Sequence, residues 1–174
     1  NRADLLKRAL DSIARQKHKP DQVVISDNAS TDHTQGVFKE FVKSGIDVRY
    51  HRHDTNIGML RNWQHGISLV ETKYFLVLAD DDYLLSNCIK AGMDSLNADP
   101  NLGMWCGVTV CVDINFKPIL LAPSQLEAID NLKNFDLLTH MLQHPASTGT
   151  IFSKEIFERV GGFRDESGYL ADLS

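Results

Sequence analysis

The sequence predicts an α/β fold with a mainly parallel central sheet. Short, apolar, β-branched segments alternate with longer segments whose apolar residues recur at helical spacing. Polar turns separate these segments, and such alternation is typical of right-handed strand–helix–strand units with parallel strands. The 174 residues, 43% hydrophobic and 24% charged, fit one globular domain rather than a disordered or fibrous chain.

The first half of the chain shows the alternation most clearly. Residues 3–16 are expected to form a helix, since Leu6, Leu10 and Ile13 fall on one stripe. Residues 22–26 are too short and too apolar for a helix, which predicts a strand covered on both faces. By the same criteria we expect helices at about 33–43, 57–70 and 86–97, and strands at 47–50 and 74–78.

After Met104 the predicted elements become shorter. We expect strands at 104–112 and 116–121, a helix at 134–142, a strand at 148–152 and a helix at 154–160. Gly161 and Gly162 are expected to end that last helix, because glycine readily adopts the left-handed cap conformation.

Two acidic turns follow predicted strands, where parallel sheets bind their ligands. In the first, V-I-S-D-N-A-S-T-D at 24–32, Asp27 comes directly after the strand and can accept hydrogen bonds from a base or ribose. The alternative is helix capping, which explains Thr31 and Asp32 as well as ligand binding does. Capping explains Asp27 less well.

The second turn carries three consecutive carboxylates, Asp80, Asp81 and Asp82, after an otherwise apolar strand. A divalent cation with oxygen ligands relieves their repulsion, and Mg²⁺ or Mn²⁺ holding a diphosphate fits this pattern. The alternative is a solvated acidic turn that caps the helix after Ser86. A net charge of −5 leaves no broad basic face for nucleic acid, so an anionic ligand needs a cation as intermediary.

Five motifs, taken in order, resemble the family 2 inverting glycosyltransferases of the GT-A fold. They are N-R-A-D-L-L at 1–6, V-V-I-S-D-N-A-S-T-D at 23–32, N-I-G-M-L-R-N-W at 56–63, the aspartate triplet, and V-G-G-F-R-D-E at 160–166. The resemblance implies a Rossmann-like three-layer α/β/α domain over 1–174. It also implies a nucleotide-binding half at 1–103, an acceptor-side half at 104–174, and a first strand that precedes Asn1 and a C-terminal part that are both missing from this chain.

The resemblance also implies which residues bind the donor. Asp27 would contact the nucleotide base with Asn28 beside it, and Arg61 and Asn62 would lie near the base or diphosphate. The triplet matches the family's DxD motif, although Ala79 takes the first acidic place in one register. Asp81 is then the leading metal ligand, Asp82 shares the metal or orients its waters, and Asp80 approaches the ribose.

The catalytic base of the family lies beyond the Gly-Gly-Phe turn. The matching position here is Asp172, with Asp165 and Glu166 as competing candidates. The implied reaction is a direct displacement, in which the base takes the proton of an acceptor hydroxyl while Mn²⁺ or Mg²⁺ stabilises the departing nucleoside diphosphate. Inversion at the anomeric carbon follows from attack opposite the leaving group.

The sequence therefore predicts an enzyme that transfers a sugar from a nucleotide-diphosphate sugar to a saccharide or lipid-linked acceptor, in bacterial cell-surface glycan synthesis. One alternative is a catalytically silent nucleotide-sugar or glycan-binding domain. A receiver-type domain is a second, but receiver domains place their acids after different strands, whereas three acids here share one turn. No apolar run is long enough to span a bilayer, which predicts a cytoplasmic location, with peripheral membrane association through the missing regions.

The histidines are expected to be surface or cap residues rather than metal ligands. His51 and His53 alternate at a strand end, and no third ligand is evident from the sequence.

Overall fold

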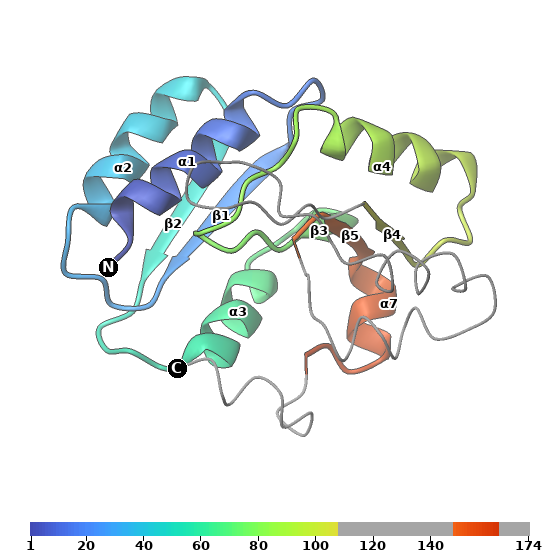
Figure 1. Cartoon of the computed structure of the whole chain (residues 1–174). Coiled ribbons are helices and arrows are strands. Elements are labelled where there is room, and N and C mark those ends of the chain that lie inside the picture. The colour runs from blue at the N-terminus through green and yellow to red at the C-terminus, as the bar shows by residue number, and fades with distance from the viewer. Residues whose placement is uncertain (108–147, 164–174) are drawn as a thin grey trace, which may run out of the picture. The chain divides into compact units, whose positions relative to one another are not determined.

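The computed structural model describes residues 1–107 and 148–163, which belong to one compact unit (Figure 1). Its helices are α1 (Ala3–Ala14), α2 (Thr34–Phe41), α3 (Met59–Ser68), α4 (Cys88–Ala98) and α7 (Lys154–Arg159), with a 3-10 turn at Val42–Ser44. Its strands are β1 (Gln22–Asp27), β2 (Asp47–Arg52), β3 (Tyr74–Leu76), β4 (Met104–Cys106) and β5 (Thr150–Ser153). The predicted strand at 116–121 and helix at 134–142 lie outside the described residues.

The predicted element types are confirmed within these ranges, and the bounds differ by a few residues. The first helix ends at Ala14 rather than residue 16, and β2 runs on to Arg52. Gly161 and Gly162 follow α7 with φ angles of 89° and 63°, so the predicted glycine end of that helix is confirmed.

The strands form two ladders of different kinds. β1 and β2 are parallel, from the pair Gln22–Asp47 to the pair Asp27–Arg52, as the alternation predicts. β5 pairs antiparallel with both β3 and β4. The strands β3 and β4, joined through α4, therefore run in one direction, and β5 lies between them in the opposite one. The alternation did not predict this reversed strand, because pairing direction depends on a partner distant in sequence.

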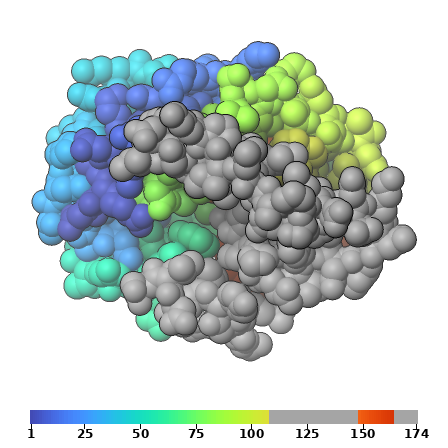
Figure 2. All heavy atoms as spheres, viewed as in Figure 1, coloured from blue at the N-terminus to red at the C-terminus, as the bar shows by residue number. Residues whose placement is uncertain are grey.

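β1 is covered on both faces. Val23 and Ile25 point to one face and are buried, while Ser26 points to the other, where Gly66 of α3 approaches it so closely that a Cβ there would lie 3.3 Å from the Ser26 Cβ. The first face packs against α1 and α2 in a core cluster of Ala3, Leu10, Val23, Ile25, Val37 and Phe41. Helix, sheet and helix thus form three layers, and α1 and α2 lie side by side in the space-filling view (Figure 2).

The second ladder packs closely against α4. A Cβ on Gly92 of that helix would lie 2.5 Å from Ile151 Cδ1 and 2.7 Å from Trp105 Cε3, so only glycine allows this approach. Leu96, one turn further along α4, is 1% exposed and Ile151 is 3% exposed. β3, which leads to the aspartate turn, belongs to this same ladder through its pairing with β5.

Candidate functional site

The first acidic turn is held by the buried carboxylate of Asp27, the last residue of β1. The side chain is 3% exposed. Its Oδ1 accepts the Ser30 backbone N–H at 2.9 Å, and its Oδ2 accepts the Tyr50 hydroxyl at 2.5 Å and lies 3.8 Å from Arg52 Nε. Burial by itself raises the pKa of Asp27, but the hydrogen bonds from Ser30 and Tyr50 and the charge of Arg52 lower it below its ordinary value.

The backbone of this turn is unusual. Ala29 has a φ of 65°, a left-handed conformation that a non-glycine residue seldom adopts. Its N–H donates to the Asp27 carbonyl at 2.9 Å. Arg52 Nε and Nη2 donate to the Ser30 carbonyl at 3.1 and 2.9 Å, which fixes the next residue as well. Such strain persists only where the surroundings determine the conformation, and it is concentrated at functional sites.

Asp32 closes the same turn by binding the N-termini of two helices. Its Oδ1 accepts the N–H and hydroxyl of Thr34, where α2 begins, at 3.1 and 2.6 Å. Its Oδ2 accepts the N–H of Ala3, where α1 begins, at 3.0 Å. The Thr34 hydroxyl is the main cause that lowers the pKa of Asp32 to about 2. The capping alternative is therefore confirmed for Asp32, and it does not extend to Asp27.

The aspartate triplet follows β3 and is bridged by one cation of the protein. Arg2 lies 3.1 Å from Asp80 Oδ2 through Nε and 3.0 Å from Asp81 Oδ2 through Nη1. Asp82 Oδ2 accepts the hydroxyl of Thr148. Since α4 begins only at Cys88, the triplet does not cap that helix.

The three carboxylates differ in exposure. Asp80 is half-buried, and burial raises its pKa; the nearby charge of Arg2 opposes this shift and the charge of Asp81 adds to it. Asp81 and Asp82 are exposed. A guanidinium shared by two carboxylates shows that their oxygens converge on one position of positive charge. The donor set therefore fits a hard divalent cation with oxygen ligands.

The motif at 56–63 is joined to the first turn. Asn28 Nδ2 donates to Asn56 Oδ1 at 2.7 Å, and Asn28 Oδ1 accepts the N–H of Ile57 at 2.8 Å. Gly58 then starts α3 with φ 85° and ψ 157°, a conformation that only glycine adopts readily. Asn28 thus holds the segment that leads into α3.

The two predicted donor residues on α3 differ in their surroundings. Arg61 is exposed. Asn62 contacts β1, because its Nδ2 donates to the Ser26 carbonyl at 3.0 Å and its Oδ1 accepts the Ser26 hydroxyl at 2.8 Å. As placed, Asn62 joins α3 to β1. Asp172, Asp165 and Glu166 lie outside the described residues.

The structure brings the two turns together through the segment Asn1–Ala3. Asn1 Oδ1 accepts the N–H and hydroxyl of Thr31 at 2.6 and 3.1 Å, while Arg2 reaches the triplet. Sequence reasoning missed Arg2, and also Tyr50 and Arg52 as partners of Asp27. The sequence could have indicated Tyr50 and Arg52 together, because side chains two residues apart in a strand point to the same face.

The expectation that the histidines are surface or cap residues, with no third ligand beside His51 and His53, needs correction. His65 of α3 lies against His51 and His53, with ring centroids 4.2 and 4.6 Å away. Burial lowers the pKa of His65, and the charges of His51 and His53 lower it further. His53 and His65 are half-buried rather than surface residues.

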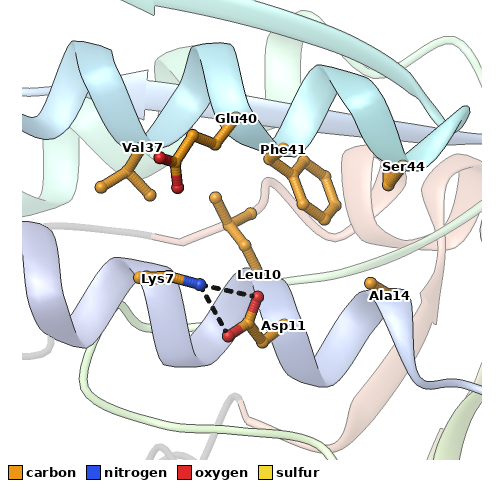
Figure 3. Close-up of a pocket in the computed structure, with 8 residues that line it drawn as sticks. All are labelled: Lys7, Leu10, Asp11, Ala14, Val37, Glu40, Phe41 and Ser44. Carbon is orange, nitrogen blue, oxygen red and sulfur yellow. Dashed lines mark hydrogen bonds and ion pairs between the residues drawn. The ribbon is translucent and has the colours of Figure 1, made fainter.

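A shallow hollow of about 220 Å³ lies between α1 and α2 (Figure 3). Its rim carries Glu40 and the ion pair between Lys7 and Asp11, and no residue of either acidic turn lines it. The hollow is therefore separate from the candidate site. Among the described helices, none is long and apolar enough to cross a membrane.

Solved structures share this fold. The crystal structure of S. aureus TarS 1-349 in complex with UDP matches with a TM-score of 0.71 and 17% identity, over 95% of this chain and 48% of that one. The mannosyltransferase PcManGT from Pyrobaculum calidifontis, in complex with GDP-Man and Mn²⁺, matches with a TM-score of 0.68 and 19% identity, over 97% and 46%. The fold is GT-A, as predicted.

Curated relatives match the sequence over shorter stretches. The GalNAc(5)-diNAcBac-PP-undecaprenol beta-1,3-glucosyltransferase of Campylobacter jejuni is 30% identical over 98 residues, 56% of this chain and 32% of the relative. Abequosyltransferase RfbV of Salmonella typhimurium is 33% identical over 92 residues, 51% of this chain and 28% of the relative. The match thus spans about a third of these relatives or less.

The family model for glycosyl transferase family 2 matches residues 1–161. This match covers most of the 174 residues and includes both acidic turns. The chain therefore belongs to glycosyl transferase family 2.

Proposed function

We propose that this chain is the donor-binding part of a metal-dependent glycosyltransferase that moves a sugar from a nucleoside-diphosphate sugar to an acceptor hydroxyl, with inversion. The observation that carries the proposal is the convergence of Asp80 and Asp81 on one cationic position, at the edge where Asn1–Ala3 also meets the first turn. The family and the named relatives support sugar transfer in bacterial glycan synthesis.

The donor is proposed to lie across the two turns. Asp27 and Asn28 are assigned to the side of the nucleotide base, with Arg61 and Asn62 on α3 beside it. Both oxygens of Asp27 already have partners in the protein, so its contribution includes holding the turn in shape. Asp80 is assigned to the ribose. TarS and PcManGT were solved with UDP and with GDP-Man, which supports a nucleotide at this edge of the shared fold.

The residues of the triplet fit a bound Mn²⁺ or Mg²⁺. Asp81 is the proposed principal ligand because it is exposed and already pairs with a cation, and Asp82 is proposed to share the ion or orient its waters. Held there by Asp81 and Asp82, a divalent ion would supply positive charge against the departing diphosphate. Asp82 receives a hydrogen bond from Thr148, which orients its carboxylate.

The remaining step belongs to the acceptor side. Asp172 is proposed to remove the proton of the acceptor hydroxyl as that oxygen attacks the anomeric carbon opposite the diphosphate. The acceptor is proposed to be a saccharide or a lipid-linked saccharide, bound at the cytoplasmic face of the membrane. The C. jejuni relative, whose name includes PP-undecaprenol, supports the lipid-linked class.

Calorimetric titration tests the donor site. UDP, GDP and dTDP are titrated into the chain with and without Mn²⁺, and into Asp81→Ala. We expect binding that requires Mn²⁺ and is lost in Asp81→Ala. The matched control is Asp94→Ala, which removes an exposed carboxylate paired with Lys90 on α4. Equal diphosphate binding by wild type and Asp81→Ala contradicts the site assignment.

A transfer assay tests the chemistry. A panel of nucleotide sugars is incubated with saccharide acceptors, and the anomeric configuration of the product is read by nuclear magnetic resonance. Inversion and its loss in Asp172→Asn are expected. Metal-dependent diphosphate binding without transfer or donor hydrolysis favours the silent binding domain instead.

A further inference from the structure

Three histidines from two elements meet on the face of β2 that is turned toward α3. His51 pairs with Ser26 in the parallel ladder, so its side chain shares the face of β1 that α3 covers. His53 follows directly after β2, and its ring centroid lies 4.7 Å from that of His51. On α3, Asn62 and His65 are three residues apart and so share the side that contacts β1.

We propose that His51, His53 and His65 form a binding site for a transition-metal ion of the Zn²⁺ class. One ligand nitrogen from each residue lies within 4.8 Å of the others, and the group consists of imidazoles alone. Imidazole favours zinc, nickel, copper and cobalt, whereas Mg²⁺ and Mn²⁺ favour carboxylate and water oxygens. The site is thus different in kind from the aspartate triplet.

The spacing fits tetrahedral coordination after a small movement. Zn–N bonds of about 2.0–2.1 Å place the nitrogens of neighbouring ligands roughly 3.4 Å apart. The observed upper limit of 4.8 Å exceeds this by about 1.4 Å. His51 is exposed, so its side chain has room to move toward the other two without disturbing the core.

The hydrogen bonds around His65 favour a proton on Nδ1 and a lone pair on Nε2. Asn62 Nδ2 donates to the Ser26 carbonyl, which leaves Asn62 Oδ1 to accept the only proton of the Ser26 hydroxyl. Ser26 Oγ can therefore only accept from His65 Nδ1, 3.4 Å away. With Nδ1 protonated, Nε2 carries the lone pair that a metal needs.

His53 supplies an independent observation. Its Nε2 is buried and has no hydrogen-bond partner in the described part of the chain. Buried polar atoms are nearly always paired, because an unpaired one loses its bonds to water without replacement. A coordinate bond supplies the partner that this nitrogen lacks. The His53 backbone N–H donates to the Asp27 carbonyl at 2.9 Å, which holds the residue beside β1.

An ion held by these residues ties the end of β2 to α3. The segment from Asn56 to Gly58 lies in the chain between the ligands at the end of β2 and the ligand on α3, and Asn28 already holds it at one side. The site therefore stabilises the start of α3, where the proposed donor residue Arg61 lies. This role is structural, and it does not depend on the proposed transfer activity.

The test is metal titration of the full chain carrying Asp81→Ala, so that the aspartate triplet contributes little. Co²⁺ is added first, because its visible absorption reports tetrahedral nitrogen coordination, and Zn²⁺ is then added in competition. We expect one Co²⁺ per chain, displaced by Zn²⁺, and a rise in Tm on Zn²⁺ addition. Loss of a residue that only hydrogen-bonds a metal ligand typically weakens metal affinity by roughly 10–100-fold. Adding His51→Ala removes a ligand itself and is expected to weaken Co²⁺ and Zn²⁺ affinity by more than this.

Two further variants separate ligation from general effects. His18→Ala removes an exposed histidine between α1 and β1 and leaves metal affinity and the Tm shift unchanged. Ser26→Ala removes the acceptor for His65 Nδ1 and lowers the affinity by about 10-fold, less than His51→Ala. Absence of tetrahedral Co²⁺ absorption, or equal affinity with and without His51→Ala, overturns the proposal. If the metal binds only to histidines elsewhere in the chain, His51→Ala leaves the affinity unchanged, and the proposal is overturned.

Discussion

Replacing Tyr50 by phenylalanine tests how the first acidic turn is held. The substitution removes only the hydroxyl that donates to Asp27 Oδ2 at 2.5 Å, while the ring keeps its stacking on Phe38, 4.7 Å between centroids. Hydrogen bonds to charged groups contribute about 1.5–3 kcal/mol. The carboxylate keeps the Ser30 N–H and the more distant Arg52. We expect the free energy of unfolding to fall by about 2 kcal/mol at pH 7, roughly a 30-fold change in the folding equilibrium.

The same variant has an expected pH dependence. The folded-state pKa of Asp27 lies below its value of 3.8 in a model peptide, so the ionised carboxylate stabilises the fold above that pH. This contribution is lost as the pH falls through the folded-state pKa. Tyr50→Phe brings the pKa of Asp27 closer to its ordinary value. The difference in stability between wild type and variant is therefore largest near neutral pH and narrows below about pH 4.

Urea unfolding at pH 7 and at about pH 3, followed by circular dichroism, measures both effects. Tyr74→Phe is the control, because it deletes the same hydroxyl on β3. A cost below about 0.5 kcal/mol at pH 7, which is the range of ordinary surface substitutions, refutes the role given to the Tyr50–Asp27 bond. An equal cost at both pH values refutes the assignment of an ionised Asp27.

Three other predictions concern the backbone, the core and the triplet. Gly58→Ala is expected to cost about 1–3 kcal/mol in thermal or urea unfolding, because φ is 85° at this residue. No atom lies within 4 Å of the new Cβ, so the cost comes from the backbone and not from a clash. Gly36→Ala in α2 has equal space and should not destabilise the fold. Leu96→Ala should cost about 2–5 kcal/mol in the same assay, since the side chain is 1% exposed. Arg2→Gln should tighten Mn²⁺ binding in calorimetry, because Arg2 competes with the ion for Asp81. The expected gain is about 1.4- to 5-fold in affinity, the equivalent of one exposed ion pair. Weaker Mn²⁺ binding by the variant would contradict this competition.

Local pattern determined the elements and the positions of the two acidic turns. Apolar periodicity placed β1, α3 and α4 within a few residues, because burial of one face imposes a repeat that is visible in the sequence. The sequence also predicted that the turn at 24–32 and the triplet each follow a strand. Ligand-binding groups gather there because parallel strands present their carboxyl ends at the same edge of the sheet. The ordered motifs identified the family, which the match over residues 1–161 confirms.

The partners of those residues were decided only by the tertiary structure. Arg2 reaches Asp81 across 79 positions, β5 returns to pair with β3, and His65 meets His51 through the packing of α3 on β1. No local repeat records such contacts, since they depend on how separate elements stack and in which direction they run. The sequence by itself therefore determined where charge and polarity gather in this protein, and the tertiary structure decided which groups compensate them.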